Sequence, residues 1–113
     1  MTLDEANALL HRMAWGNPRW KYCAMCGGES GVHRTTGMLT GRPVPPCELR
    51  PLPDVLDFTA LLRGRLRRAQ FSGAGICLAC DGMLPMTAPG VSIDPMPHHK
   101  PGCEVGAILR GER

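Results

Sequence analysis

Three segments of the chain place apolar residues at helical spacing. In the first, the apolar positions recur over residues 3–15, which predicts an amphipathic helix. Thr2 and Glu5 have the form of a capping box, in which the hydroxyl accepts a hydrogen bond from one unpaired amide and the carboxylate from another. Gly16 and Pro18 follow the last apolar position, so we expect the helix to end just before them.

The second segment begins at Pro53, whose fixed backbone angle suits the first turn of a helix. Asp54 and Asp57 follow, where carboxylates favour the positive end of a helix dipole. The expected apolar stripe contains Val55, Phe58, Leu62, Leu66 and Ala69. A glycine-rich stretch follows at 72–75, so the pattern predicts a helix from residue 53 to about residue 70.

A third and shorter apolar pattern predicts a helix over 103–110. The stretches 27–52 and 81–101 show no sustained period and are rich in glycine and proline, which is typical of loops. We expect one short hairpin in the first stretch and a short strand at 91–93 in the second. The pattern along the chain therefore alternates helices with long loops and contains little β-structure.

The composition indicates that the chain has few large apolar residues with which to build a hydrophobic core. Glycine (14) and proline (11) make up more than a fifth of the 113 residues, against about 12% in an average protein. Leu, Val, Ile and Phe together account for only about a fifth of the chain, a level at which apolar burial alone rarely stabilises so short a fold. The net charge of +3 is too small to indicate disorder, so another source of stability is expected.

The six cysteines offer that source. Cys23 with Cys26, and Cys77 with Cys80, form two Cys-x-x-Cys pairs, a spacing that directs two sulfurs at one ion. Structural zinc needs four ligands, so each pair requires partners. In one pairing, these four cysteines share a single zinc site.

In the pairing that we favour, each Cys-x-x-Cys pair recruits its own partners and two zinc ions bind. The N-terminal ligands would be Cys23, Cys26, His33 and Cys47. The C-terminal ligands would be Cys77, Cys80, His99 and Cys103, with His98 as the alternative to His99. This pairing uses all six cysteines, and the second set has a spacing similar to that of treble-clef and other zinc fingers.

Other uses of the cysteines are less well matched. The acidic N-terminus does not have the form of a secretory signal, so we expect a cytoplasmic protein without disulfides. Neither pair leads directly into a helix, as a thioredoxin-like redox site would require. An iron–sulfur cluster held by four cysteines stays an alternative. The predicted fold class is a small, α-rich, metal-stabilised fold with three short helices and two Cys-x-x-Cys knuckles, forming either a single domain over 1–113 or two zinc-centred halves, 1–70 and 71–113.

Basic and aromatic residues suggest a binding surface. Arg63, Arg65, Arg67 and Arg68 would surround the exposed side of the second helix, where they could contact phosphates. The alternative is a solvated helix face or a protein contact. The aromatic residues before the first knuckle, Trp15, Trp20 and Tyr22, are expected to cover that knuckle. The alternative is a platform on which the bases of a single-stranded nucleic acid stack.

The Cys-x-x-Cys-Gly-Gly sequence at 23–28 and the segment 77–103, which ends with His99 and Cys103, resemble those of small zinc-finger proteins of phages and mobile elements. The resemblance implies a non-enzymatic regulator or inhibitor that binds nucleic acid or a host protein complex, as phage accessory or anti-defence proteins do. No catalytic motif, small-molecule site or membrane span is evident. The alternative function is an HNH-like treble-clef nuclease, in which His98 would be the general base.

Overall fold

The computed structural model describes residues 1–16, 21–29, 31–37, 39–71, 75–85 and 93–112. Its elements follow the order α1 (Leu3–Trp15), α2 (Phe58–Ala69), the 3-10 turn η1 (Met96–His98) and α3 (Glu104–Leu109). Within these residues, β-structure is confined to isolated antiparallel bridges. The expectation of a small fold with three short helices is confirmed. The strand expected at 91–93 falls mostly outside the described residues.

Helix α1 has the predicted bounds, and both hydrogen bonds of the capping box form. The Glu5 amide donates to Thr2 Oγ1, and the Thr2 amide donates to the Glu5 carboxylate, each at 3.2 Å. The buried side of α1 consists of Ala6, Leu9, Leu10, Met13 and Ala14. Local sequence therefore accounts for this helix completely.

Helix α2 begins five residues later than predicted, at Phe58. The chain before it cannot enter the helix at Pro53, because the neighbouring Leu52 is buried in the core and its amide donates to Asn7 Oδ1 of α1 at 2.7 Å. Residues 53–57 form turns instead, and Val55, which the helical pattern placed in the core, is 43% exposed. A long-range contact has overridden the local helical signal here.

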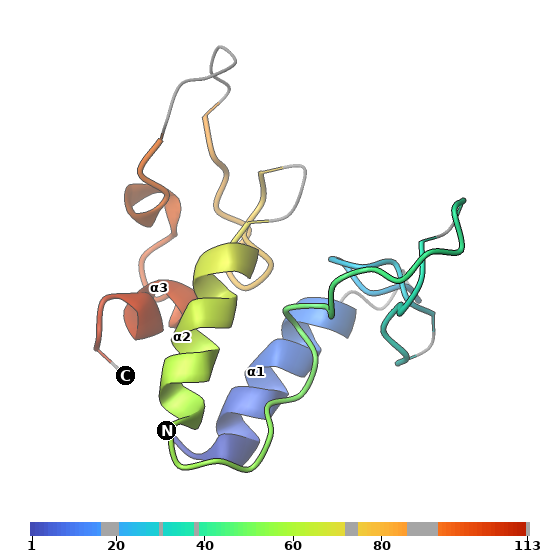
Figure 1. The fold of residues 1–113 in the computed structure, drawn as a ribbon. Helices are drawn as coiled ribbons and strands as arrows, with labels where there is room; N and C mark the ends of the chain where they lie inside the picture. Colours follow the sequence, from blue (N-terminus) through green and yellow to red (C-terminus); the bar gives the residue numbers. More distant parts are fainter. Residues whose placement is uncertain (17–20, 30, 38, 72–74, 86–92, 113) are drawn as a thin grey trace.

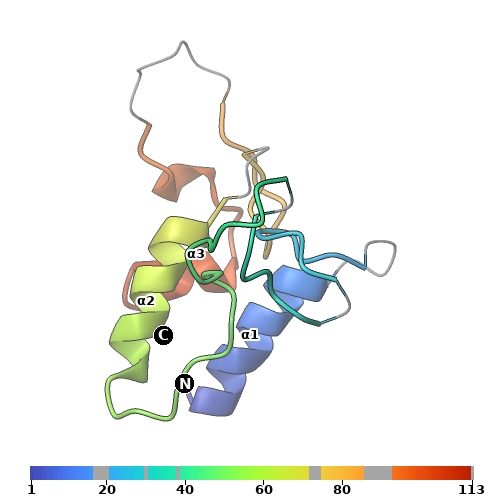
Figure 2. The ribbon, with the colours of Figure 1, turned by 45° about the vertical axis from the view of Figure 1, so that its right-hand side comes forward.

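Helices α1 and α2 lie beside each other, with their N-terminal ends at the same end of the molecule (Figures 1 and 2). Helix α3 packs against α2. All three helices and the connection before α2 contribute to one hydrophobic cluster, whose largest fully buried members are Leu9, Leu10, Leu49, Leu62, Leu66, Val105 and Ile108. Four of the cysteines are buried in the same cluster, so the metal-ligand candidates are also part of the core.

A short hairpin-like turn is present where one was expected in the first loop. Thr36 and Pro43 form an antiparallel bridge, and the Gly37 amide donates to the Arg42 carbonyl at 2.8 Å. None of the helices, in the part of the chain that the structure describes, has the length and apolar character needed to cross a bilayer.

Candidate metal centres

The first Cys-x-x-Cys pair forms a tight turn stabilised by its own backbone. The Cys23 amide donates to the Gly28 carbonyl at 2.7 Å, and the Gly27 amide donates back to the Cys23 carbonyl at 3.0 Å. Gly27 has a φ of 74°, which glycine adopts without strain. The Gly28 amide then points at Cys26 Sγ, 3.4 Å away. This turn holds both sulfurs on one side and supplies an N–H group to one of them.

The second pair repeats this geometry bond for bond. The Cys77 amide donates to the Gly82 carbonyl at 2.8 Å, and the Asp81 amide donates to the Cys77 carbonyl at 2.9 Å. The Gly82 amide points at Cys80 Sγ, again 3.4 Å away. Asp81 adopts a φ of 60°, a conformation that aspartate tolerates better than most residues. The two knuckles are therefore repeats of one local structure.

A glycine in each knuckle lets the segment with the histidine pass closely. A Cβ atom at Gly28 would overlap the carbonyl oxygen of Val32, the residue before His33. A Cβ atom at Gly82 would likewise overlap the carbonyl oxygen of His98, the residue before His99. Each glycine thus allows a histidine ring to reach the sulfurs of its knuckle.

The structure brings the eight candidate ligands together as two separate clusters. Within each cluster, the potential donor atoms all lie within 4.8 Å of one another. The clusters are Cys23, Cys26, His33 and Cys47, and Cys77, Cys80, His99 and Cys103. These are the sets that the two-site pairing predicts, and the single four-cysteine site is not the observed arrangement. His98 lies outside both sets.

The distances match tetrahedral metal coordination. Zinc–sulfur bonds of about 2.3 Å and zinc–nitrogen bonds of about 2.0–2.1 Å place two sulfurs about 3.8 Å apart and a sulfur and a nitrogen about 3.5 Å apart. The Sγ atoms of Cys23 and Cys47 are 3.9 Å apart, and those of Cys77 and Cys103 are 3.8 Å apart. These separations are nearly twice the length of a disulfide bond, and all six cysteines are free.

Both histidines direct the Nδ1 atom at the sulfurs. His33 Nδ1 lies 3.3 Å from Cys26 Sγ. His99 Nδ1 lies 3.6 Å from Cys103 Sγ and 3.9 Å from Cys80 Sγ. Each cluster therefore presents three sulfurs and one imidazole nitrogen, a donor set that suits zinc.

Burial and hydrogen bonds act in opposite directions on the ionisation of the sulfurs. Burial raises the pKa of Cys77 to about 12, so this thiol resists ionisation without a positive charge beside it. Burial also opposes ionisation of Cys80, but the amides of Lys100 and Gly82 outweigh it and lower the pKa of that thiol. In the N-terminal cluster, a hydrogen bond from the Cys47 thiol lowers the pKa of Cys23 to about 4. A divalent ion would stabilise every thiolate in both clusters.

The rings of His33 and His99 differ in their hydrogen-bond and packing partners. His99 is 8% exposed, and burial lowers its pKa, which favours the neutral ring that coordinates metals. Its Nε2 atom lies 2.9 Å from Gln70 Oε1, so Nε2 carries the proton and Nδ1 is left free for a metal. The ring of Phe71 stacks on it, with centroids 4.8 Å apart. His33 packs on Trp15 at 4.5 Å, but its buried Nε2 has no hydrogen-bond partner among the described residues.

Gln70 and Phe71 were not found from the sequence, because they follow the helix α2 and precede the knuckle without any motif of their own. The expected cover of the first knuckle is confirmed for Trp15. Residues 17–20 lie outside the described part of the chain.

The arginine cluster differs from the expectation. Arg65 is only 5% exposed, and its guanidinium donates to the carbonyl oxygens of Arg50 and Pro51. The prediction that it lies on the exposed side of the helix is therefore wrong. The reason is that the connection before α2 folds back across this side of the helix and offers carbonyl groups that need a donor.

The other three arginines are not equivalent either. Arg68 forms a two-bonded ion pair with Glu48, at 2.8 and 3.0 Å. Arg63 is half-buried, and its Nε has no partner within the described residues. Arg67 is exposed. The four residues therefore do not form one continuous cationic surface.

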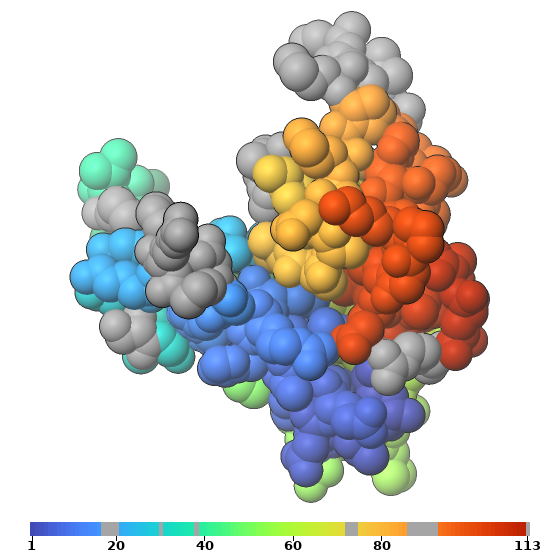
Figure 3. All heavy atoms as spheres, turned by 180° about the vertical axis from the view of Figure 1, so that it is seen from behind, coloured from blue at the N-terminus to red at the C-terminus, as the bar shows by residue number. Residues whose placement is uncertain are grey.

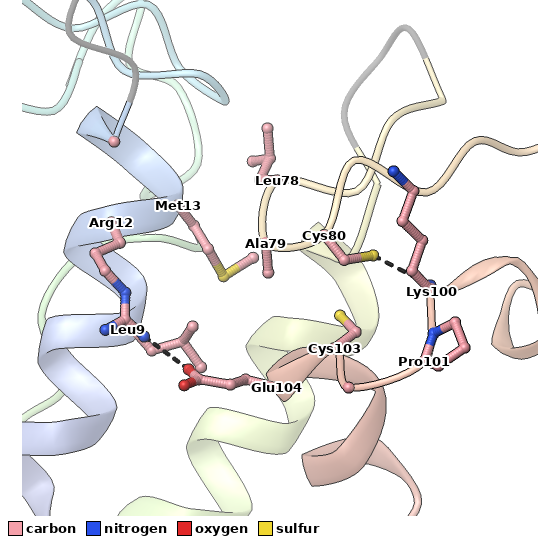
Figure 4. Close-up of a pocket in the computed structure, with 12 residues that line it drawn as sticks. Leu9, Arg12, Met13, Leu78, Ala79, Cys80, Lys100, Pro101, Cys103 and Glu104 are labelled. Atoms are coloured by element: carbon pink, nitrogen blue, oxygen red, sulfur yellow. Dashed lines mark hydrogen bonds and ion pairs between the residues drawn. The ribbon is translucent and has the colours of Figure 1, made fainter.

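A hollow of about 570 Å³ lies between α1 and the second knuckle (Figure 4). Its walls include Met13 and Leu78, and the 2.7 Å ion pair of Arg12 with Glu104 joins α1 to α3 beside it. Because these charges are paired with each other and the sulfurs at its edge belong to the metal cluster, the lining offers few groups for recognising a polar ligand.

Comparisons of this chain with protein-family models, with curated proteins and with solved structures give no significant match.

Proposed function

We propose that this protein binds two zinc ions, one in each Cys3His cluster, and that both ions are structural. The main support for two zinc sites is the spacing of the donor atoms, which lie within 4.8 Å of one another in both clusters. Four protein ligands complete a tetrahedron and leave no open position for a substrate or an activated water. A set of three thiolates and one imidazole also fits zinc better than an iron–sulfur cluster, whose usual ligands are four cysteines.

Zinc would supply the stability that the small core lacks. Structural zinc contributes about 10–16 kcal/mol of apparent binding free energy in zinc-finger peptides. That is comparable to the whole stability of a typical domain, about 5–15 kcal/mol. Since Cys23, Cys47, Cys77 and Cys103 are buried in the hydrophobic cluster, metal binding and core formation are coupled.

On this scaffold we propose a non-enzymatic role, in which the protein acts as a small regulator or inhibitor by binding a macromolecular partner. A protein partner is the better supported of the two classes considered. Arg65 is buried against backbone carbonyls, and Arg68 is paired with Glu48, so half of the arginines expected to contact phosphates are engaged within the chain. The nuclease alternative gains no support, since His98 belongs to neither cluster and the described residues contain no third group of metal ligands.

The test is the zinc content per chain, measured by native mass spectrometry. We expect two zinc ions in the wild type and one in each of the Cys47→Ser and Cys103→Ser variants. His99→Ala and His98→Ala form a matched pair of neighbouring residues, of which only the first should lose an ion. One zinc ion per chain that survives both cysteine substitutions would refute the two-site proposal.

The partner class is tested by replacing Arg63 and Arg67 with glutamine. If the protein binds nucleic acid through α2, retention on a nucleic-acid column and its salt dependence should fall. We expect no such change, because we assign the binding role to a protein partner. A clear loss of salt-dependent retention would overturn that assignment in favour of nucleic acid.

A further inference from the structure

One end of the molecule combines exposed apolar side chains with carboxylates. The N-terminal ends of α1 and α2 meet there, together with the segment 51–57 that leads into α2 (Figures 1 and 2). The hydrogen bond from the Leu52 amide to Asn7 ties this segment to α1. Figure 3 shows the first residues of the chain, in dark blue, beside green atoms of this region at the same end. Both knuckles lie toward the opposite end (Figure 1).

The apolar side chains at this end are not explained by the core. Leu56 is fully exposed, at 101%, and Val55 is 43% exposed. Leu61, in the first turn of α2, and Met1 are each 41% exposed. Large apolar groups that gather on one surface are typical of interaction sites. We name this surface the acidic–apolar end and define it by Met1, Asp4, Asp54, Val55, Leu56, Asp57 and Leu61.

The charge at this end is opposite to that of the rest of the chain. Residues 1–11 and 51–62 contain four of the ten acidic residues and none of the 13 lysines and arginines. Besides these carboxylates, the end carries the single positive charge of the Met1 amino group. Asp57 stands at the N-cap of α2 but makes no side-chain capping hydrogen bond. The carboxylates of Asp54 and Asp57 form no ion pair with any residue that the structure describes. These carboxylates are therefore available to an external cation.

We propose that the acidic–apolar end binds a basic amphipathic helix of a partner protein. Leucine-type side chains of such a helix would bury Leu56 and Val55, and the lysines or arginines that flank its apolar face would pair with Asp54 and Asp57. The carboxylates would repel nucleic-acid phosphates and anionic lipids, and they oppose a symmetric contact between two copies of this end. This inference names the partner class of the proposed function and rests on it.

The experiment uses the full chain, purified in the presence of zinc, and two synthetic helical peptides of equal length. One peptide carries leucine and lysine in an amphipathic pattern, and the other has glutamate in place of each lysine. Binding is measured by fluorescence anisotropy at several salt concentrations. We expect the leucine–lysine peptide to bind, more weakly as salt rises, and the leucine–glutamate peptide not to bind.

Two variants and one matched control locate the site. Leu56→Ser should weaken binding about tenfold or more, because a buried leucine contributes about 1.5–3 kcal/mol. Asp54→Asn combined with Asp57→Asn should weaken binding and reduce its salt dependence. Leu39→Ser is the control. Leu39 is 97% exposed but lies between Thr36 and Pro43, in the hairpin-like turn of the first loop, so its replacement should not affect binding.

Several outcomes would overturn the inference. These are no binding of the leucine–lysine peptide, equal binding of both peptides, or unchanged binding by Leu56→Ser. A dimer of the chain in sedimentation experiments that Leu56→Ser abolishes would assign this end to self-association instead. Zinc content is measured in the same samples: two ions per chain without peptide binding refutes this inference alone, whereas Leu56-dependent binding with no zinc refutes the zinc proposal alone.

Discussion

Gln70 is expected to control the zinc affinity of the C-terminal cluster. Its Oε1 atom accepts a hydrogen bond from Nε2 of His99 at 2.9 Å, which orients the ring and leaves Nδ1 unprotonated toward the sulfurs of Cys80 and Cys103. Replacing Gln70 with alanine removes this acceptor and leaves the ring N–H of a largely buried histidine without a protein partner.

The magnitude follows from that single hydrogen bond. A net loss of about 1–1.5 kcal/mol per hydrogen bond corresponds to about a tenfold lower metal affinity. This is the lower end of the 10–100-fold range typical for groups that orient metal ligands. Because Gln70 Nε2 also donates to the Arg67 carbonyl at 3.1 Å, the alanine variant loses a second contact at the end of α2.

Gln70→Glu separates the two contacts. Glutamate keeps an acceptor for His99 but has no N–H group for the Arg67 carbonyl, so it should retain the zinc affinity that alanine loses. The assay is zinc competition with a chelator, followed by the NMR signals of the His33 and His99 rings. His33, whose Nε2 lacks a described partner, reports on the N-terminal cluster and should be unaffected. Equal affinity of wild type and Gln70→Ala, or equal losses in both variants, would refute the reasoning.

Three further predictions concern stability. Removal of zinc by a chelator should abolish cooperative thermal unfolding, and added zinc should restore it; an unchanged melting curve would contradict the structural role of the metal. Arg65→Ala should lower the free energy of unfolding by about 1–3 kcal/mol, because it removes the donor to the partly buried carbonyl oxygens of Arg50 and Pro51. Arg67→Ala should change the free energy of unfolding little in denaturant titrations. Gly82→Ala should destabilise the protein, because the added Cβ would overlap the His98 carbonyl oxygen. Gly64→Ala should instead stabilise it by about 0.5–1 kcal/mol, because Gly64 lies within α2 and a Cβ there would make only ordinary contacts. Equal effects of the two substitutions on the free energy of unfolding would contradict this account.

Metal-ligand grouping and the first helix were predictable because short-range spacing encodes them. Two residues between cysteines dictate a turn with both sulfurs on one side, and the capping box of Thr2 and Glu5 specifies a helix start. The assignment of Cys47 and Cys103 to separate sites followed from using every cysteine near its own pair. Their donor atoms lie together as predicted.

What could not be read from the pattern depends on contacts between distant segments. The start of α2 moved to Phe58 because Leu52 bonds to Asn7, 45 residues away, and the same contact leaves Val55 exposed. Arg65 is buried because the connection before α2 folds over its helix.

The amino-acid order specifies the local turns and the chemistry of the ligands, since these need only neighbouring residues and their backbone hydrogen bonds. The three-dimensional packing selects His99 in place of His98, supplies Gln70 as its hydrogen-bond partner and gathers an acidic, apolar surface at one end. Those features depend on how segments far apart in the chain pack against one another, and short-range sequence patterns do not specify that packing.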